Sequence, residues 1–215
     1  MKLCMIGTGY VGLVSGTCFA DIGNQVYCVD KDKNKIDKLN SGISPIYEPG
    51  LDELIKKNYN ANRLIFTTDI KKAINSSDLI FICVGTPTKK GSLKVDLSFV
   101  YKCSKEILKH TKKKKIIITK STVPVGTGDE IEKIFKKKKK LFNVISNPEF
   151  LREGEAIRDF RYPDRIVIGS DNKNEFKTMR KLYSPLISKG AKFFTTSRKG
   201  AELIKYASNA FLATK

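Results

Sequence analysis

Several features that define other protein classes are missing from this sequence of 215 residues. No apolar run reaches eighteen residues, so we expect no transmembrane helix. The five cysteines are odd in number and form no C-x-x-C pair, which argues against a disulfide scaffold or a zinc ribbon. Glycine and proline, at 15 and 7 residues, exclude collagen and proline-rich chains. With 40% hydrophobic and 29% charged residues, the chain is typical of a globular protein.

The cysteines are expected to be reduced thiols, most of them buried, in a cytoplasmic protein. Four of the five lie in apolar stretches. They are Cys4, Cys18, Cys28, Cys83 and Cys103.

Basic residues outnumber acidic ones by 41 to 22, for a net charge of +19. Such a charge suggests a nucleic acid as a possible partner. However, 34 of the basic residues are lysine and only 7 are arginine, the residue that most often forms bidentate contacts with phosphates and bases. The lysine runs at 112–115 and 136–140 lie where predicted helices end and carry no interleaved aromatics, so we interpret them as solvated surface. His110, beside the first run, is also interpreted as a surface residue. We expect neither a nucleic acid nor a membrane as partner, with weak polyanion binding as the alternative.

Apolar strand-like runs alternate with longer amphipathic segments. Residues 79–84 are apolar without alternation, as in strands covered on both faces of a parallel sheet. The pattern predicts an α/β fold, a Rossmann-like, doubly wound and mainly parallel sheet. The predicted strands are 3–6, 25–29, 64–67, 79–84, 116–119, 143–146, 165–168 and 192–195, and the predicted helices are 10–22, 31–40, 51–57, 97–109, 127–138, 174–184 and 199 onward. Asp96 or Ser98 is the expected cap of the helix at 97–109.

The first predicted strand runs directly into a glycine-rich loop, Gly7-Thr8-Gly9-Tyr10-Val11-Gly12, and a helix follows. In this context Gly7 permits a tight turn, Gly9 lets the backbone approach a pyrophosphate, and Gly12 lets the helix pack closely on the strand. The free N–H groups of the helix then face the phosphates. A glycine turn without ligand, or a different nucleotide, remains an alternative.

The second predicted strand ends at Asp30, placed to accept hydrogen bonds from the ribose hydroxyls of a dinucleotide. A carboxylate there favours NAD over NADP, because it repels a 2′-phosphate. The nearby Lys31 and Lys35 leave NADP open, since a base could tolerate that phosphate.

Polar segments also end three later strands, at 84–87, 120–127 and 147–154. The carboxyl ends of parallel strands form the ligand crevice, so these segments are expected to meet there. Lys205 and Asn209 are four residues apart and share a helical face, from which they could donate hydrogen bonds to a developing alkoxide.

Taken together, seven motifs closely resemble the UDP-glucose/GDP-mannose dehydrogenase family, in family order and from end to end of the chain. They are G-T-G-Y-V-G at 7–12, P-I-Y-E-P-G-L at 45–51, V-G-T-P at 84–87, K-S-T-V-P-V-G-T at 120–127, N-P-E-F-L-R-E-G at 147–154, D-R-I-V-I-G at 164–169 and E-L-I-K-Y-A-S-N-A-F at 202–211.

The resemblance implies oxidation of a sugar-nucleotide C6 alcohol to a carboxylate with two NAD per sugar, and no metal. UDP-glucose is the expected substrate, with GDP-mannose or a UDP-N-acetylhexosamine as alternatives. The family's catalytic positions match Thr122, which holds a water, the acidic pair Glu149 and Glu153, and Lys205 with Asn209. Its cofactor positions match Gly7, Gly9, Tyr10, Val11, Gly12, Asp30, Lys35, Thr86, Pro87, Thr122 and Glu153. Its substrate positions match Glu149, Phe150, Leu151, Arg152, Glu153, Lys205 and Asn209.

The resemblance also implies a second half that this sequence lacks. The family's catalytic cysteine lies in a G-x-x-x-C-x-P-K-D context, which none of the five cysteines has. We therefore interpret 1–197 as an NAD-binding domain and 198–215 as the beginning of a long central helix, in a fragment that binds NAD without turning over substrate. The complete family protein is expected to be a homodimer. A non-catalytic NAD-binding remnant remains an alternative.

Overall fold

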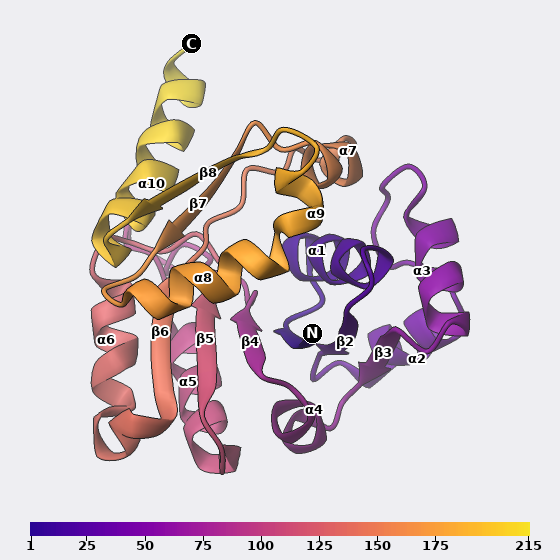
Figure 1. The fold of residues 1–215 in the computed structure, drawn as a ribbon, viewed down its shortest axis with the longest axis horizontal. Helices are drawn as coiled ribbons and strands as arrows, with labels where there is room; N and C mark the ends of the chain where they lie inside the picture. The colour runs from indigo at the N-terminus through magenta and orange to yellow at the C-terminus, as the bar shows by residue number, and fades with distance from the viewer.

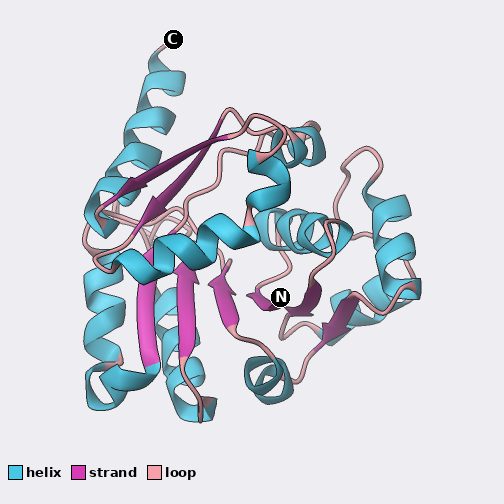
Figure 2. Cartoon of the chain, in the orientation of Figure 1, coloured by secondary structure: helices cyan, strands magenta, loops and turns pink.

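Eight strands form one sheet in the order β3-β2-β1-β4-β5-β6-β7-β8. The computed structural model describes all residues from 1 to 215 and places helices on both sides of this sheet (Figures 1 and 2). The strands are β1 (Lys2–Ile6), β2 (Gln25–Val29), β3 (Leu64–Thr67), β4 (Leu79–Ile82), β5 (Lys115–Thr119), β6 (Phe142–Ser146), β7 (Arg165–Gly169) and β8 (Lys192–Thr196).

The first six strands pair in parallel, as the uninterrupted apolar runs predicted. β7 joins β6 antiparallel through the single pair Ser146 and Gly169, and β8 then pairs with β7 in parallel. The prediction of a doubly wound, mainly parallel α/β sheet is confirmed. The last helix, which follows β8, packs against β7 and β6.

Two separate cores flank the sheet, and successive strand residues alternate between them. In β1, Leu3 and Met5 pack into the larger core, whereas Cys4 and Ile6 pack into the smaller one. Six helices cover the larger core: α1 (Tyr10–Asp21), α2 (Lys33–Asn40), α3 (Leu51–Asn60), α7 (Ala156–Arg161), α8 (Lys173–Leu182) and α9 (Ser184–Ile187). Three helices cover the smaller core: α4 (Ile70–Ser76), α5 (Ser98–His110) and α6 (Thr127–Ile134). Both strand faces are therefore buried, which explains the absence of polar alternation.

The last helix, α10 (Arg198–Thr214), begins beside β7 and projects from the body of the molecule toward the C-terminus (Figure 1). Its apolar residues Leu203, Phe211 and Leu212 are 57%, 67% and 70% exposed. None of the helices combines the length and the apolar character that a bilayer crossing needs.

Several local predictions differ from the structure. The short helices α4, α7 and α9, of seven, six and four residues, were not predicted, because so few turns carry little periodicity. The helix predicted at 127–138 ends at Ile134, and a 3-10 segment, η1 (Lys136–Leu141), follows with Lys138 outside helical geometry. Adjacent lysine charges repel one another and disfavour a regular α-helix there.

The start of α5 is also different from the prediction. Leu97 occupies the N-cap position and makes no side-chain cap. The Asp96 carboxylate instead accepts a hydrogen bond from the Ser98 N–H at 2.9 Å, so neither predicted residue is the cap. His110, at the end of this helix, is half-buried and lies 3.3 Å from the Glu106 carboxylate, which corrects its interpretation as a surface residue.

All five cysteines are free and buried, as expected. Burial raises the pKa of each thiol, to about 12 for Cys18 and for Cys83, so these side chains pack as neutral apolar groups.

Candidate functional site

The glycine-rich loop turns sharply at the end of β1 because two of its glycines lie against backbone. Gly7 has a φ of +100°, and a Cβ on it would lie 2.8 Å from the Cys83 carbonyl oxygen at the end of β4. A Cβ on Gly12 would lie 1.9 Å from the Gly7 carbonyl oxygen. The first turn of α1 can therefore pack onto the loop only without these side chains.

Gly9 has the opposite environment, with no atom within 4 Å of the place where its Cβ would be. It is the N-cap of α1, and no side chain caps that helix. The loop thus leaves open space in front of a positive helix terminus, and a pyrophosphate fits both features.

Asp30 follows β2 and faces the loop from the side. Its Oδ2 accepts hydrogen bonds from the Thr8 N–H at 3.0 Å, the Thr8 hydroxyl at 2.8 Å and the Lys35 ammonium at 3.2 Å, and its Oδ1 accepts one from the Asp32 N–H at 3.1 Å. Burial alone would raise the pKa of Asp30, but these donors outweigh it and lower the pKa. The carboxylate is therefore ionised and oriented for ribose hydroxyls.

The two lysines that left NADP open are both engaged. Lys35 forms its ion pair with Asp30, and the Lys31 ammonium lies over the Phe99 ring, 5.5 Å from its centroid. Neither is a free cation beside Asp30, so the arrangement fits NAD better than NADP.

Side chains tie the loops that follow β4 and β5 to each other. The Thr86 hydroxyl donates to the Thr122 carbonyl at 2.9 Å, and the Ser121 hydroxyl donates to the Val84 carbonyl at 2.6 Å. Thr86 and Thr122 are half-buried, whereas Pro87 is exposed. These loops lie at the carboxyl edge of the sheet, the edge that also carries the glycine-rich loop.

A cavity of about 610 Å³ opens between the 147–154 segment and α10. The Lys205 ammonium lies 3.1 Å from the Glu149 carboxylate inside it, with side chains only 9% and 11% exposed. The other carboxylate oxygen of Glu149 accepts from the Leu151 N–H at 2.6 Å. The lining includes the predicted residues Glu149, Phe150, Leu151, Arg152, Lys205 and Asn209.

A buried contact at one end and a surface ion pair at the other hold the 147–154 segment in place. Asn147 donates to the Val167 carbonyl at 3.0 Å and accepts from the Tyr183 hydroxyl at 2.6 Å. At the other end, the Arg152 guanidinium forms two hydrogen bonds to Asp159, at 3.0 and 2.7 Å. Both anchors are side-chain contacts that cross from one element to another.

The Phe150 ring lies between two cations of this cavity. The Arg165 guanidinium stands 4.3 Å from its centroid and the Lys205 ammonium 5.3 Å. The lining of the cavity holds five cationic side chains and three carboxylates, a balance that suits a polar, anionic ligand.

Lys120 also lines the cavity, and the sequence argument did not name it as a site residue. It is only 4% exposed, and burial lowers its pKa despite the opposing influence of Cys83 and Glu149. Its place at the end of a buried strand, in the K-S-T-V-P segment, was the sequence feature that could have indicated a site residue.

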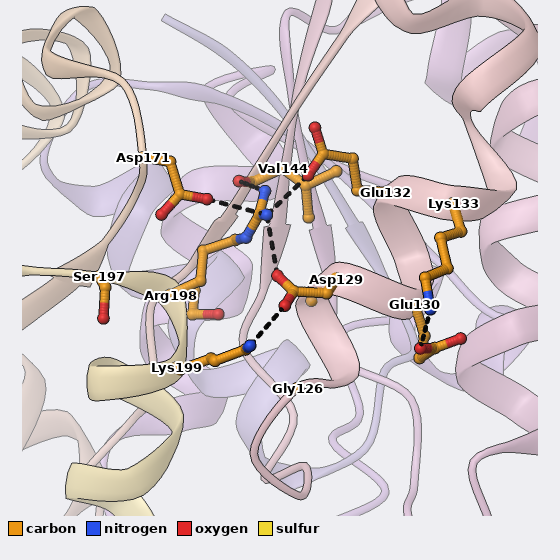
Figure 3. Close-up of polar contacts among 12 residues, drawn as sticks. Gly126, Asp129, Glu130, Glu132, Lys133, Val144, Asp171, Ser197, Arg198 and Lys199 are labelled. Atoms are coloured by element: carbon orange, nitrogen blue, oxygen red, sulfur yellow. Dashed lines mark hydrogen bonds and ion pairs between the residues drawn. The ribbon is translucent and has the colours of Figure 1, made fainter.

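A charge network anchors the base of α10 and thereby places Lys205 (Figure 3). The Arg198 guanidinium reaches Asp129 and Glu132 of α6 at 2.9 and 2.6 Å and Asp171 at 2.9 Å. One turn later, Glu202 accepts from the Gly126 and Gly128 N–H groups at 2.6 and 2.8 Å. Arg198, Glu202 and Lys205 recur at helical spacing, so the first two orient the face that carries the third.

Three predicted residues have surroundings that the motifs did not indicate. Glu153 is exposed and does not line the cavity that holds Glu149, so the acidic pair is not brought together there. Asn209 lines the cavity but is exposed and forms no hydrogen bond. The Tyr10 hydroxyl turns to the buried Glu48 carboxylate and away from the open space at Gly9.

The chain matches known proteins over its whole length. The profile of the UDP-glucose/GDP-mannose dehydrogenase family, NAD binding domain, covers residues 1–187. A UDP-glucose 6-dehydrogenase of Rhizobium meliloti is 52% identical and one of Bacillus subtilis 51% identical, each over 100% of this chain. The chain spans 50% and 46% of their respective lengths.

Solved structures agree with this comparison. A GDP-mannose dehydrogenase from Pseudomonas aeruginosa superposes with a TM-score of 0.93 at 38% identity, over 100% of this chain and 50% of that one. A UDP-glucose dehydrogenase from Pyrobaculum islandicum gives a TM-score of 0.90 at 35% identity, over 98% of this chain and 49% of that one. Sequence motifs, site geometry and fold therefore agree that the chain belongs to the UDP-glucose/GDP-mannose dehydrogenase family, whose NAD-binding domain it carries.

Proposed function

We propose that these residues serve the NAD-dependent oxidation of UDP-glucose to UDP-glucuronate, with two successive hydride transfers from C6. The observation that carries the proposal is the buried Lys205–Glu149 pair, 3.1 Å apart, in a cavity at the same sheet edge as an open dinucleotide loop. The curated relatives are named for UDP-glucose, and this supports that sugar nucleotide over GDP-mannose or a UDP-N-acetylhexosamine.

Bound NAD would supply the hydride acceptor, and this chain supplies its binding and orientation. The Gly9 backbone and the first turn of α1 hold the pyrophosphate, with Val11 in that turn, and Asp30, oriented by Lys35, accepts from the ribose hydroxyls. Thr86 and Pro87 border the same crevice.

Lys205 is assigned the stabilisation of negative charge on the C6 oxygen as the alcohol loses its proton. An ammonium held at 3.1 Å by Glu149 in a nearly buried cavity is preorganised for that task. Asn209, one turn along the same face, adds an amide donor. Phe150, Leu151 and Arg152 shape the sugar side of the cavity.

Thr122 is assigned to hold a water for the later hydrolytic step, with Glu149 and Glu153 as the carboxylates that activate it. Glu153 would act from the cofactor side, because it is exposed outside the cavity that holds Glu149.

The five thiols of this chain do not supply the nucleophile for the second oxidation. Each is buried with a raised pKa, whereas a thiolate nucleophile needs exposure and a lowered pKa. We therefore expect residues 1–215 alone to bind NAD and to release no NADH at a steady rate.

We further propose that residues 1–197 form the NAD-binding domain and that α10 begins a connecting helix. The exposed Leu203, Phe211 and Leu212 support this, as apolar side chains that are available for further packing. A homodimeric, cytoplasmic enzyme is the assembly and location that we propose with it.

The test is binding by the 215-residue chain. NADH titration, followed by its fluorescence, is expected to give a saturable 1:1 complex. Calorimetry is expected to rank UDP-glucose above GDP-mannose, and Lys205→Met to weaken UDP-glucose while leaving NADH unchanged. Lys177→Met is the matched control, because Lys177 on α8 is exposed, forms no ion pair and does not line the cavity. Absence of NADH binding, equal affinity for the sugar nucleotides, or steady NADH release would contradict the proposal.

A further inference from the structure

Glu48 is a buried carboxylate without a cationic partner. It lies in the segment between α2 and α3, is 6% exposed and forms no ion pair. Its carboxylate accepts instead from the Tyr10 hydroxyl, the Gly154 N–H at 2.9 Å and the Ile157 N–H at 3.2 Å. A buried carboxylate is tolerated where such donors compensate its desolvation, so the three contacts act as a unit.

Tyr10 connects this unit to the cofactor loop. It is the first residue of α1 and directly follows Gly9, where the pyrophosphate space opens. Its hydroxyl donates to Glu48 and accepts from the Gly154 N–H at 3.0 Å. Burial, followed by the hydrogen bond to Glu48, raises the pKa of Tyr10, so the hydroxyl keeps its proton.

Gly154 connects the unit to the other half of the site. Its N–H belongs to the peptide bond with Glu153, and its φ of +85° makes it a turn residue. Because both the Tyr10 hydroxyl and the Glu48 carboxylate accept from this N–H, they fix the Glu153–Gly154 peptide bond, where the segment that begins at Glu149 ends.

We propose that Tyr10, Glu48 and Gly154 form a latch that couples occupancy of the dinucleotide loop to the order of residues 149–154. A ligand that fixes the first turn of α1 restrains the Tyr10 side chain, which restrains the Glu153–Gly154 peptide through the latch. Because coupling is reciprocal, an ordered 149–154 segment in turn strengthens NAD binding. Tyr10 and Glu48 are thus positioning residues. The inference rests on the proposed binding of NAD and adds the regulation of that site.

The experiment is amide hydrogen exchange, read by NMR on the 215-residue chain with and without saturating NADH. In the native chain, NADH is expected to slow exchange at Gly154 and Ile157 at least threefold. Tyr10→Phe and Glu48→Gln are expected to speed exchange at these amides roughly three- to tenfold without NADH and to remove the NADH effect. The Kd for NADH is expected to rise by roughly two- to tenfold in both variants.

The matched controls are Tyr59→Phe and Glu53→Gln, whose side chains form no hydrogen bond and no ion pair. They are expected to match the native chain in exchange and in Kd. A purely structural role would alter exchange with or without ligand but leave the NADH-dependent difference intact, and that result overturns the inference. If Glu48→Gln does not fold, Tyr10→Phe decides alone.

The outcomes separate the two proposals. Native NADH binding with unchanged exchange at Gly154 and Ile157 in both variants overturns the latch and leaves the proposed function standing. No NADH binding by the native chain overturns both. Loss of the NADH-dependent protection in the variants, with unchanged controls, supports the latch.

Discussion

Two glycines of one loop, three residues apart, should respond in opposite ways to the same substitution. Gly12→Ala places a Cβ 1.9 Å from the Gly7 carbonyl oxygen, and real Cβ atoms essentially never approach closer than 3.0 Å. Gly7 cannot easily move aside, because its N–H bonds to the Val29 carbonyl at 2.8 Å. Gly9→Ala meets nothing within 4 Å, and the φ of Gly9, −70°, suits alanine.

The expected magnitudes follow from this geometry. Overpacking against backbone lowers the free energy of unfolding by about 3 kcal/mol. Replacing a flexible helical glycine by alanine raises it again by about 1 kcal/mol. The net loss of about 2 kcal/mol lowers the Tm of Gly12→Ala by roughly 4–8 °C. Gly9→Ala gains about 0.4–1 kcal/mol, because its unfolded state has fewer conformations. Both variants should lose NADH binding, the first because the loop shifts and the second because the methyl group occupies the pyrophosphate space.

Thermal unfolding followed by circular dichroism, together with NADH titration, checks both parts. A Gly9→Ala variant that binds NADH with the native Kd would refute the assignment of that open space to the pyrophosphate. A Gly12→Ala variant with the native Tm would refute the reasoning from packing.

Three further predictions concern single side chains. Asp30→Asn is expected to weaken NADH binding about tenfold, from the loss of charge-assisted hydrogen bonds. Because the fold lowers the pKa of Asp30, the ionised carboxylate stabilises the native chain above about pH 4. This stabilisation is lost as the pH falls through the lowered pKa, so the urea midpoint of the variant should change less with acidic pH than that of the native chain. Arg198→Met leaves Asp171 without a cation, whereas Asp129 and Glu132 keep lysine partners at 3.2 and 3.8 Å. The substitution should cost about 1–2 kcal/mol, measured by urea unfolding, because these carboxylates are 34–60% exposed. Tyr183→Phe leaves the buried Asn147 oxygen without its donor and should cost about 1–3 kcal/mol, whereas Tyr162→Phe, at an exposed tyrosine, should cost nothing measurable. An unchanged urea midpoint in either destabilising variant would contradict the contact assigned to it.

Local patterns were sufficient to predict the sheet and the cofactor loop. The unbroken apolar run at 79–84 predicted a strand buried on both faces, and β4 is buried on both faces over Leu79–Ile82. The spacing of Gly7, Gly9 and Gly12 predicted a turn, an open approach and a close contact, which the structure shows. Residues close together in the sequence produce these features, so a local sequence pattern is enough to predict them.

The lining of the cavity was predicted only in part. The motifs named Glu149 and Lys205, and the structure pairs them. They did not indicate that Glu153 lies outside the cavity, because the three residues that separate it from Glu149 have irregular backbone without periodicity. Lys120 was not named although it lies in the K-S-T-V-P segment, since a lysine at a strand end is usually solvated.

The sequence by itself thus determined the fold class, the glycine-rich loop and most of the predicted substrate residues that line the cavity, through patterns that span a few residues. Only the tertiary structure decided which side chains meet. Tyr10 reaches Gly154 across 144 residues, and Arg198 reaches Asp129 across 69. Such contacts have no local pattern, because they arise where helices pack on the sheet edge and buried polar groups there must find partners.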